Sequence, residues 1–262
     1  GHNGEVRAEY PPSKYLLELC MLAGVAGLPL CIAGAVWLWR TTTFRPLAVC
    51  PGVVVVGMLV AGGKGYYAAP ALLVLFAAGA VAMERRAATR ARQLRQVLLL
   101  VLPMLVGLPI GVAVLPAQTM VHLGLTSIRS DYAEELGWPE LVDTVTAAYV
   151  GLPSSERDHL AILTRNYGEA GALTLLAGDR TLPPVVSGHL AFGDWPLARP
   201  DAKRLLVVGY SQDDLRRYCT ATRVVATVTN RYAVDNEENG GPVMYCELRR
   251  PLAESWPQLK HY

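Results

Sequence analysis

The sequence predicts an α-helical membrane bundle of four spans, followed by a small extracytoplasmic α/β domain. Of the 262 residues, 52% are hydrophobic and only 18% are charged, whereas ordinary globular domains carry about 25% charged residues. Four long apolar stretches all lie before residue 119, and the remaining chain consists of short apolar runs separated by turns. The predicted division is an extracytoplasmic segment at 1–14, four transmembrane helices within 15–118, and an extracytoplasmic α/β domain at 119–262.

Each of the four stretches is long enough to cross a hydrocarbon core of about 30 Å, which takes roughly 20 helical residues. The spans are predicted at residues 15–39, 47–63, 65–83 and 96–118. Glu18 is the only charged residue within the first span, and Lys64 separates the second from the third. A soluble protein with four buried helices is the alternative, but those helices would fill a large part of the chain. The high apolar content also excludes intrinsic disorder.

The distribution of charge predicts the orientation of the spans. Two arginines lie within residues 40–45 and five within residues 85–95. Positively charged loops stay in the cytoplasm. Because successive spans cross the membrane in opposite directions, both of these loops lie on the same side of it. Segment 1–14, the loop around Lys64 and everything after about Pro116 are therefore predicted to lie outside the cytoplasm. The predicted location is the plasma (inner) membrane, with membrane lipid around the spans.

A nucleic-acid-binding arm is another interpretation of the same charges. Residues 1–116 hold 10 lysines and arginines against 4 acidic residues, a net charge of +6, and residues 117–262 hold 14 against 18, a net charge of −4. The basic half is also the apolar half, which a membrane explains better. No nucleic-acid partner is predicted.

The second half alternates between strand-like and helix-like segments. In chain order these are a helix at 139–149, a strand at 160–164, a turn at 166–171 leading into a helix to 177, a strand at 205–209, a short helix after Ser211, and strands at 224–228 and 243–246. Ser211 is a typical N-cap residue, and acidic residues follow it in the first turn. The alternation predicts a compact α/β domain with a largely parallel sheet.

The cysteines leave one question open. Cys219 and Cys246 lie in the predicted extracytoplasmic domain, where oxidation is possible, but their positions in the sequence do not show whether they are close. There is no CxxC or His-x-x-x-His spacing, so no metal site is predicted.

The turn between the second and third spans is the first candidate site. Lys64 is flanked by glycines, and Tyr66 and Tyr67 follow it at the membrane surface. A lysine in this position can approach an anionic head group. The alternative is that Lys64 binds no ligand: its charged end only extends to the membrane interface, and the two tyrosines belong to the aromatic belt that membrane proteins have at this depth.

Polar loops of the α/β domain form the second set of candidates. They are Asn166, Tyr167, Glu169, His189, Asn236 and Glu237. The turn at 166–171 offers backbone N–H groups to an anion, but Glu169 would compete with that anion or simply complement the helix dipole. The run 235–241 offers ligands to a cation or a sugar hydroxyl, with a solvated loop as the alternative. A lone histidine such as His189 is more often structural or exposed. No Ser/His/Asp arrangement is evident.

Several segments, in the same order along the chain, resemble a bacterial membrane glycosyltransferase of family 39, related to protein O-mannosyltransferases and lipid A aminoarabinose transferases. Gly63-Lys64-Gly65-Tyr66-Tyr67-Ala68-Ala69-Pro70 resembles the Lys-x-Tyr-Tyr-x-x-Pro hairpin of the family. The other similar segments are Asn166-Tyr167-Gly168-Glu169-Ala170-Gly171-Ala172, Ser187-Gly188-His189, Asp235-Asn236-Glu237-Glu238 and the ending Trp256-Pro257-x-x-x-His261-Tyr262. Leu190 departs from the family pattern, in which a polar or aromatic residue usually follows the histidine.

The resemblance implies the GT-C fold and a polytopic enzyme of the cell envelope. Such an enzyme moves a sugar from a polyprenyl-phosphate donor to an extracytoplasmic acceptor, with inversion at the anomeric carbon. An aspartate in the first large extracytoplasmic loop acts as the base in that family, often with a divalent cation nearby. By analogy, Lys64, Tyr66 and Tyr67 contact the donor phosphate, where a cation stabilises the departing lipid phosphate.

No residue of this chain matches the catalytic aspartate of the family. The resemblance therefore implies that the chain corresponds to the C-terminal part of the enzyme, is inactive by itself, has no cofactor of its own, and has the N-terminal helices of the same protein as partners. The competing interpretation is a non-enzymatic four-span membrane protein whose α/β domain binds a glycan or a peptide. The enzyme interpretation predicts further spans and an acidic first loop encoded upstream of Gly1.

Overall fold

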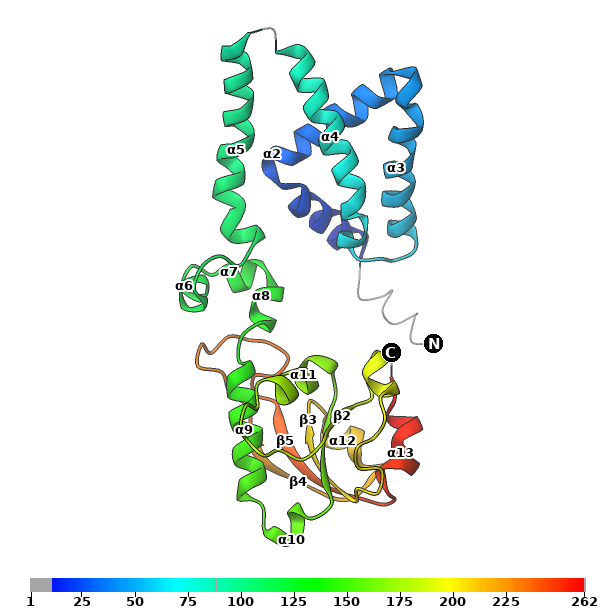
Figure 1. Ribbon diagram of the computed structural model, residues 1–262, viewed down its shortest axis with the longest axis vertical. Coiled ribbons are helices and arrows are strands. Elements are labelled where there is room, and N and C mark those ends of the chain that lie inside the picture. Colours follow the sequence, from blue (N-terminus) through cyan, green and yellow to red (C-terminus); the bar gives the residue numbers. More distant parts are fainter. Residues whose placement is uncertain (1–10, 88, 262) are drawn as a thin grey trace. The chain divides into compact units, whose positions relative to one another are not determined.

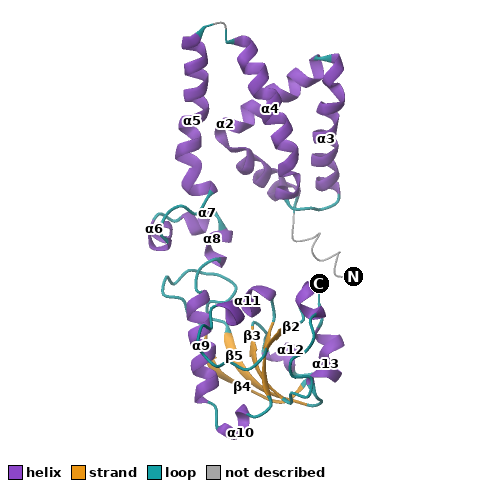
Figure 2. Ribbon diagram, in the orientation of Figure 1, coloured by secondary structure: helices purple, strands orange, loops and turns teal. Residues whose placement is uncertain are grey.

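The computed structural model describes residues 11–87 and 89–261 and divides the chain into two compact units, Gly1–Val114 and Leu115–Tyr262. Figure 1 shows the order of the elements, and Figure 2 shows that the described part of the first unit is helical, whereas the second contains a sheet. Residues 1–10 of the predicted segment 1–14 lie outside the described residues.

Within the described residues of the first unit, the elements are α2 (Pro12–Arg40), the short 3-10 helix η1 (Thr42–Phe44), α3 (Arg45–Val60), the short 3-10 helix η2 (Gly65–Ala68), α4 (Ala69–Arg86) and α5 (Arg90–Gly111). Among the described residues, two helical segments are long and apolar enough to cross a membrane, Thr42–Val60 and Gly65–Arg86. This finding is compatible with a membrane protein. The helix in the region of the predicted fourth span begins before residue 96 and ends at Gly111 rather than at 118.

The first predicted span is broken in the middle. Gly24 has φ 71° and ψ 167°, which is not helical, and the halves Pro12–Gly24 and Ala26–Arg40 meet at a bend of 97°. Glycine adopts a positive φ without the steric cost of a Cβ. The bent pair forms a third candidate span only if its two halves count as one.

Helices α2 and α4 pack through glycines whose backbones nearly touch. A Cβ at Gly34 would lie 2.1 Å from the carbonyl oxygen of Leu75, and a Cβ at Gly79 would lie 2.1 Å from that of Leu30. Small residues allow membrane helices to approach in this way. The contact fixes α4 against the half of α2 that follows the bend.

The elements of the second unit are α6 (Ala117–His122), α7 (Leu125–Ile128), α8 (Ser130–Glu134), α9 (Trp138–Gly151), α10 (Ser154–Arg157), β1 (Leu160–Thr164), α11 (Tyr167–Leu175), β2 (Val185–Ser187), the 3-10 helix η3 (Leu190–Asp194), β3 (Arg204–Val208), α12 (Gln212–Leu215), β4 (Cys219–Thr227), β5 (Pro242–Leu248) and α13 (Leu252–Leu259).

The five strands form one sheet in the order β2-β1-β3-β5-β4. Strands β2, β1 and β3 are parallel, whereas β5 runs antiparallel to both β3 and β4. The prediction of a largely parallel sheet is therefore wrong, because the sheet is mixed. Strands β4 and β5 are joined by a loop without a crossover helix, and strands connected in this way pair in antiparallel fashion.

Helices cover both faces of the sheet (Figure 1). In β1, Leu160 and Ile162 pack in a cluster with α9 and α11, and Ala161 and Leu163 pack in a second cluster with α12 and α13. Successive side chains of a strand point to opposite faces. Burial of both faces explains why β1 is a continuous apolar run rather than an alternating one.

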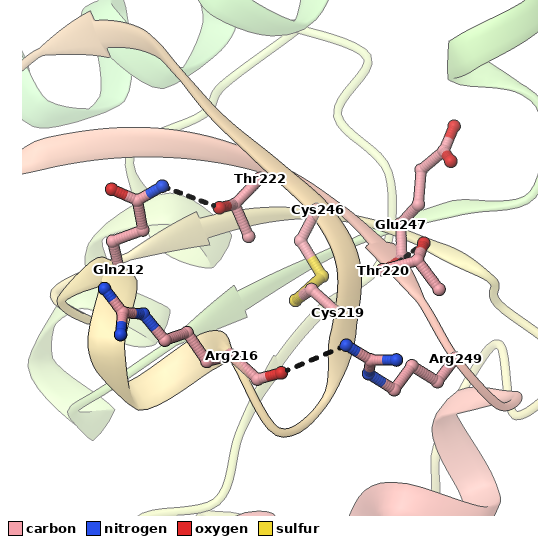
Figure 3. Close-up of a disulfide and its surroundings, with 8 residues drawn as sticks. All are labelled: Gln212, Arg216, Cys219, Thr220, Thr222, Cys246, Glu247 and Arg249. Atoms are coloured by element: carbon pink, nitrogen blue, oxygen red, sulfur yellow. Dashed lines mark hydrogen bonds between the residues drawn. A yellow bond between two sulfur atoms is a disulfide. The ribbon is translucent and has the colours of Figure 1, made fainter.

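A disulfide between Cys219 and Cys246 joins β4 to β5, with their Cα atoms 5.7 Å apart (Figure 3). The sequence left this pairing open. Gln212 lies beside it and donates a hydrogen bond from Nε2 to Oγ1 of Thr222 at 3.1 Å, which ties α12 to β4.

Candidate functional site

The Lys64 turn presents a cation and two aromatic rings at the beginning of η2 and α4. Lys64 is exposed, and Tyr66 and Tyr67 are 48% and 52% exposed. The two tyrosine rings lie nearly edge to face, with centroids 4.6 Å apart, and Nζ of Lys64 lies 5.9 Å from the centroid of the Tyr66 ring. The structure thus brings the three predicted hairpin residues together in one exposed group.

The turn is fastened to the first half of α2. The backbone N–H of Gly65 donates to Oε2 of Glu18 at 3.0 Å, and a Cβ at Gly65 would lie 2.7 Å from Cβ of Glu18. Tyr15, which is 1% exposed, donates from Oη to the carbonyl oxygen of Val55 in α3 at 2.8 Å. Glu18 is therefore the anchor of the turn, a role that sequence reasoning missed because its partner lies 47 residues away.

The polar loops of the second unit meet at one edge of the sheet. Strands β1, β2 and β3 are parallel, so the loops that follow them lie at the same edge. Strand β4 runs in the same direction, because β5 is antiparallel to both β3 and β4. This carboxyl edge therefore gathers the residues after β1, β2, β3 and β4. The predicted residues Asn166, Tyr167, Glu169, His189, Asn236 and Glu237 all lie there.

Asn166 and Glu169 form a capping box at the start of α11. The N–H of Glu169 donates to Oδ1 of Asn166 at 2.8 Å, and the N–H groups of Arg165 and Asn166 donate to Oε2 of Glu169 at 2.9 and 3.1 Å. Glu169 is only 3% exposed. Burial raises the pKa of Glu169 from 4.5 to about 7, against the two backbone hydrogen bonds, which lower it.

The neighbouring loop after β3 is closed in the same way. The N–H of Ser211 donates to Oδ2 of Asp214 at 2.9 Å, and the N–H of Asp214 donates to Oγ of Ser211 at 3.2 Å. The hydroxyl of Ser211 also donates to Oδ2 of Asp214, at 2.7 Å, and this bond and the one from the N–H of Ser211 lower the pKa of Asp214. At both loops, a carboxylate of the chain takes N–H groups that an anionic ligand would need. The geometry thus favours the interpretation of Glu169 as a helix cap over an anion site at 166–171.

Three aromatic rings form a column at the carboxyl edge. Tyr167 and His189 have ring centroids 5.0 Å apart and are tilted by 30°, and His189 and His261 have centroids 5.1 Å apart and are nearly parallel at 6°. The chain after β2 pairs with the C-terminal segment. The N–H of His261 donates to the carbonyl oxygen of Gly188 at 2.9 Å, and the N–H of Leu190 donates to that of His261 at 2.9 Å.

The electrostatic surroundings of His189 are mixed. Burial lowers its pKa and the neighbouring His261 lowers it further, whereas the charge of Glu237 raises it. Nδ1 of His189 is buried and has no hydrogen-bond partner among the described residues, and the same holds for Oη of Tyr210. Burial also raises the pKa of Tyr210.

The acidic turn between β4 and β5 is held by Asn236. Its Nδ2 donates to the carbonyl oxygens of Ala133 and Leu136 at 3.0 and 2.9 Å, and the N–H of Glu237 donates to Oε2 of Glu134 at 3.2 Å. Asn236 is therefore fully engaged in holding the loop, whereas the side chain of Glu237 is exposed.

Glu238 connects the acidic turn to the start of α11. It belongs to the similar segment 235–238 but was not among the predicted site residues. Burial, together with the charge of Glu134, raises its pKa, whereas the side chain of Asn166 lowers it. Among the described residues, no group of three or more His, Cys, Asp or Glu side chains is placed to hold a metal ion.

No protein-family model matches the sequence, and neither a comparison with curated proteins nor one with solved structures finds a match.

Proposed function

We propose that the chain is a multi-pass protein of the plasma membrane, in which α2, α3, α4 and α5 are spans and the second unit lies outside the cytoplasm. The arginines of 40–45 and 85–95 support this orientation, since positively charged loops stay in the cytoplasm. The disulfide between Cys219 and Cys246 supports it independently, because disulfides persist mainly in oxidising compartments.

We further propose that the chain forms part of a glycosyltransferase. This enzyme moves a sugar from a polyprenyl-phosphate donor to an extracytoplasmic acceptor. Lys64, Tyr66 and Tyr67 hold the donor phosphate. The observation that carries this proposal is the exposed cation beside two half-exposed phenol rings, at the end of the helical segment Gly65–Arg86, which is long enough to span a membrane.

The chemistry at this turn follows from the charge of the leaving group. When the bond between the anomeric carbon and the phosphate oxygen breaks, the bonding pair stays on that oxygen and the lipid phosphate gains negative charge. A fixed ammonium group stabilises that charge most where water is scarce. The hydroxyl groups of the tyrosines can donate hydrogen bonds to phosphate oxygens. The catalytic base is not assigned to any residue of this chain.

Donor binding can be measured without transfer activity. The chain in lipid nanodiscs is labelled with a photoreactive, diazirine-bearing polyprenyl phosphate. We expect Lys64→Ala to reduce the labelling by a factor of about ten or more, since a hydrogen bond to a charged group contributes about 1.5–3 kcal/mol. Lys64→Arg keeps the cation and should retain most of the labelling.

Two controls separate phosphate binding from lipid contact. Arg86 is an exposed cation at the opposite end of α4, so Arg86→Ala should leave the labelling unchanged. Unlabelled polyprenyl phosphate should compete, whereas uncharged polyprenol should not. Equal labelling of wild type and Lys64→Ala would contradict the proposal and favour a lysine that only reaches the membrane interface.

A further inference from the structure

Tyr167 presents a firmly supported aromatic surface at the carboxyl edge of the sheet. Its ring packs against His189, yet the residue remains 55% exposed. His189 is in turn backed by the parallel ring of His261. Two backbone hydrogen bonds of His261, with Gly188 and Leu190, hold the loop after β2 against the C-terminal segment. An aromatic ring that is already held in place loses little conformational entropy when a ligand covers it.

Space at the base of the column is filled by backbone. A Cβ at Gly188 would lie 2.0 Å from the carbonyl oxygen of Leu259, so the loop after β2 and the C-terminal segment are packed together without side chains between them. The column is therefore part of the fold, and Tyr167 is its exposed end.

Carboxylates lie at the same edge of the sheet as the Tyr167 ring, in the loop that follows β4. Glu237 is exposed, and its charge acts on His189. Burial raises the pKa of Glu238, whereas the side chain of Asn166, the residue before Tyr167, lowers it. Carboxylates accept strong hydrogen bonds from hydroxyl groups.

The same edge is unsuited to anions. The carboxylates of Glu169 and Asp214 accept hydrogen bonds from backbone N–H groups in the loops after β1 and β3. Those N–H groups would otherwise attract a phosphate. Burial and the charge of Glu237 raise the pKa of Glu134, and burial and the charges of Glu134 and Glu237 raise the pKa of Glu238. Negative charge therefore gathers at the acidic turn. A phosphate group or an anionic membrane surface would be repelled there.

We propose that Tyr167, Glu237 and Glu238 form a binding site for an uncharged carbohydrate. The C–H face of a pyranose ring is apolar and packs on the Tyr167 ring, while its hydroxyl groups donate to the carboxylates. The site goes beyond the proposed donor role, because it takes a neutral sugar rather than a phosphate and its test requires no transfer.

Binding is tested on the full chain in nanodiscs by saturation-transfer NMR. The probes are the methyl glycosides of glucose, galactose and mannose, with glucuronate as the anionic counterpart. We expect saturation transfer to at least one methyl glycoside, strongest at its ring C–H protons, and no transfer to glucuronate. Tyr167→Ala should weaken the binding about tenfold, and Glu237→Gln should weaken it severalfold. Tyr167→Phe keeps the ring and should bind within about twofold of wild type.

Leu175→Ala is the matched control, since Leu175 is 81% exposed at the far end of the same helix. It should bind as wild type does. Native folding of each variant is checked by its resistance to proteolysis. Absence of transfer to every methyl glycoside, equal binding by Tyr167→Ala, or preferential binding of glucuronate would overturn the proposal. None of these results would bear on the labelling of Lys64.

Discussion

The buried carboxylate of Glu169 lies directly against the backbone of Gly209. A Cβ at residue 209 would lie 2.4 Å from Oε1 of Glu169 and 2.8 Å from Cβ of Arg165. The loop after β1 and the loop after β3 therefore interlock where the two parallel strands end. This contact builds the part of the carboxyl edge on which Tyr167 stands.

We predict that Gly209→Ala destabilises the second unit by about 2–4 kcal/mol, because it combines overpacking with an unfavourable backbone angle. Gly209 has φ 76°. Gly178 has φ 59° and open space around it, so Gly178→Ala should cost only about 1 kcal/mol. Pulse proteolysis in urea measures both. Equal losses in the two variants would show that the contact with Glu169 adds nothing.

We predict that Glu169 makes the second unit less stable as the pH rises. Its pKa is about 7 when buried and 4.5 otherwise, so the folded chain binds more protons between these values. The contribution to stability is full below about pH 4.5 and is lost as the pH rises through 7. A shift of this size corresponds to about 3 kcal/mol.

Glu169→Gln isolates this effect. The free energy of unfolding of wild type, relative to that of Glu169→Gln, should fall by about 3 kcal/mol between pH 4 and pH 8. His189 has a lowered pKa and therefore the opposite pH dependence, but it is present in both proteins. If the difference in the free energy of unfolding between the two proteins stays constant with pH, Glu169 is not desolvated.

Much of the second unit could be predicted from local sequence. The strand predicted at 160–164 coincides with β1, and Ser211 caps α12 as expected, because apolar runs and capping residues act over a few positions. Strand β2 has only three residues, too few to stand out as a strand. The direction of β5 depends on its pairing with β3, which no local pattern reveals.

The candidate sites show the same limit. Lys64 and the loop residues of the second unit were found because turn chemistry marks them. Their anchors were not, since Glu18 meets Gly65 and His189 meets His261 only after the chain has folded. The break at Gly24 was missed as well, because a run of small residues in a span is equally typical of close helix packing.

The disulfide gives a prediction about redox state and stability. Replacing Cys219 and Cys246 with serine should destabilise the second unit by about 3–4 kcal/mol, as expected from the closure of a loop with a sequence separation of 27. In the denatured wild type, a thiol-reactive polyethylene glycol should label Cys20, Cys31 and Cys50, and all five cysteines only after reduction. Labelling of all five without a reductant would rule out the bond in the isolated protein.

The anchor of the Lys64 turn can be tested by removing its carboxylate. Glu18→Ala deletes the oxygen that accepts from Gly65, so the turn should shift and photolabelling by the polyprenyl phosphate should fall about tenfold. Glu18→Gln keeps an oxygen acceptor and should retain most of the labelling. Unchanged labelling of Glu18→Ala would mean that Lys64 is positioned without this hydrogen bond.

The contact between α2 and α4 predicts the response to a bulky residue. A Cβ at Gly79 would lie 2.1 Å from the carbonyl oxygen of Leu30, whereas a Cβ at Gly57 in α3 would meet nothing within 4 Å. Gly79→Leu must therefore push the two helices apart, which costs about 1–3 kcal/mol or more. Gly57→Leu adds a side chain of the same size at an open position.

In fluorescence-detected size-exclusion chromatography after heating, Gly79→Leu should lose its monodisperse peak at a lower temperature than wild type, while Gly57→Leu should behave as wild type. If both variants have the same melting temperature, the backbones of α2 and α4 are not in contact at Gly79, because a leucine at position 79 fits only where there is a gap between the two helices.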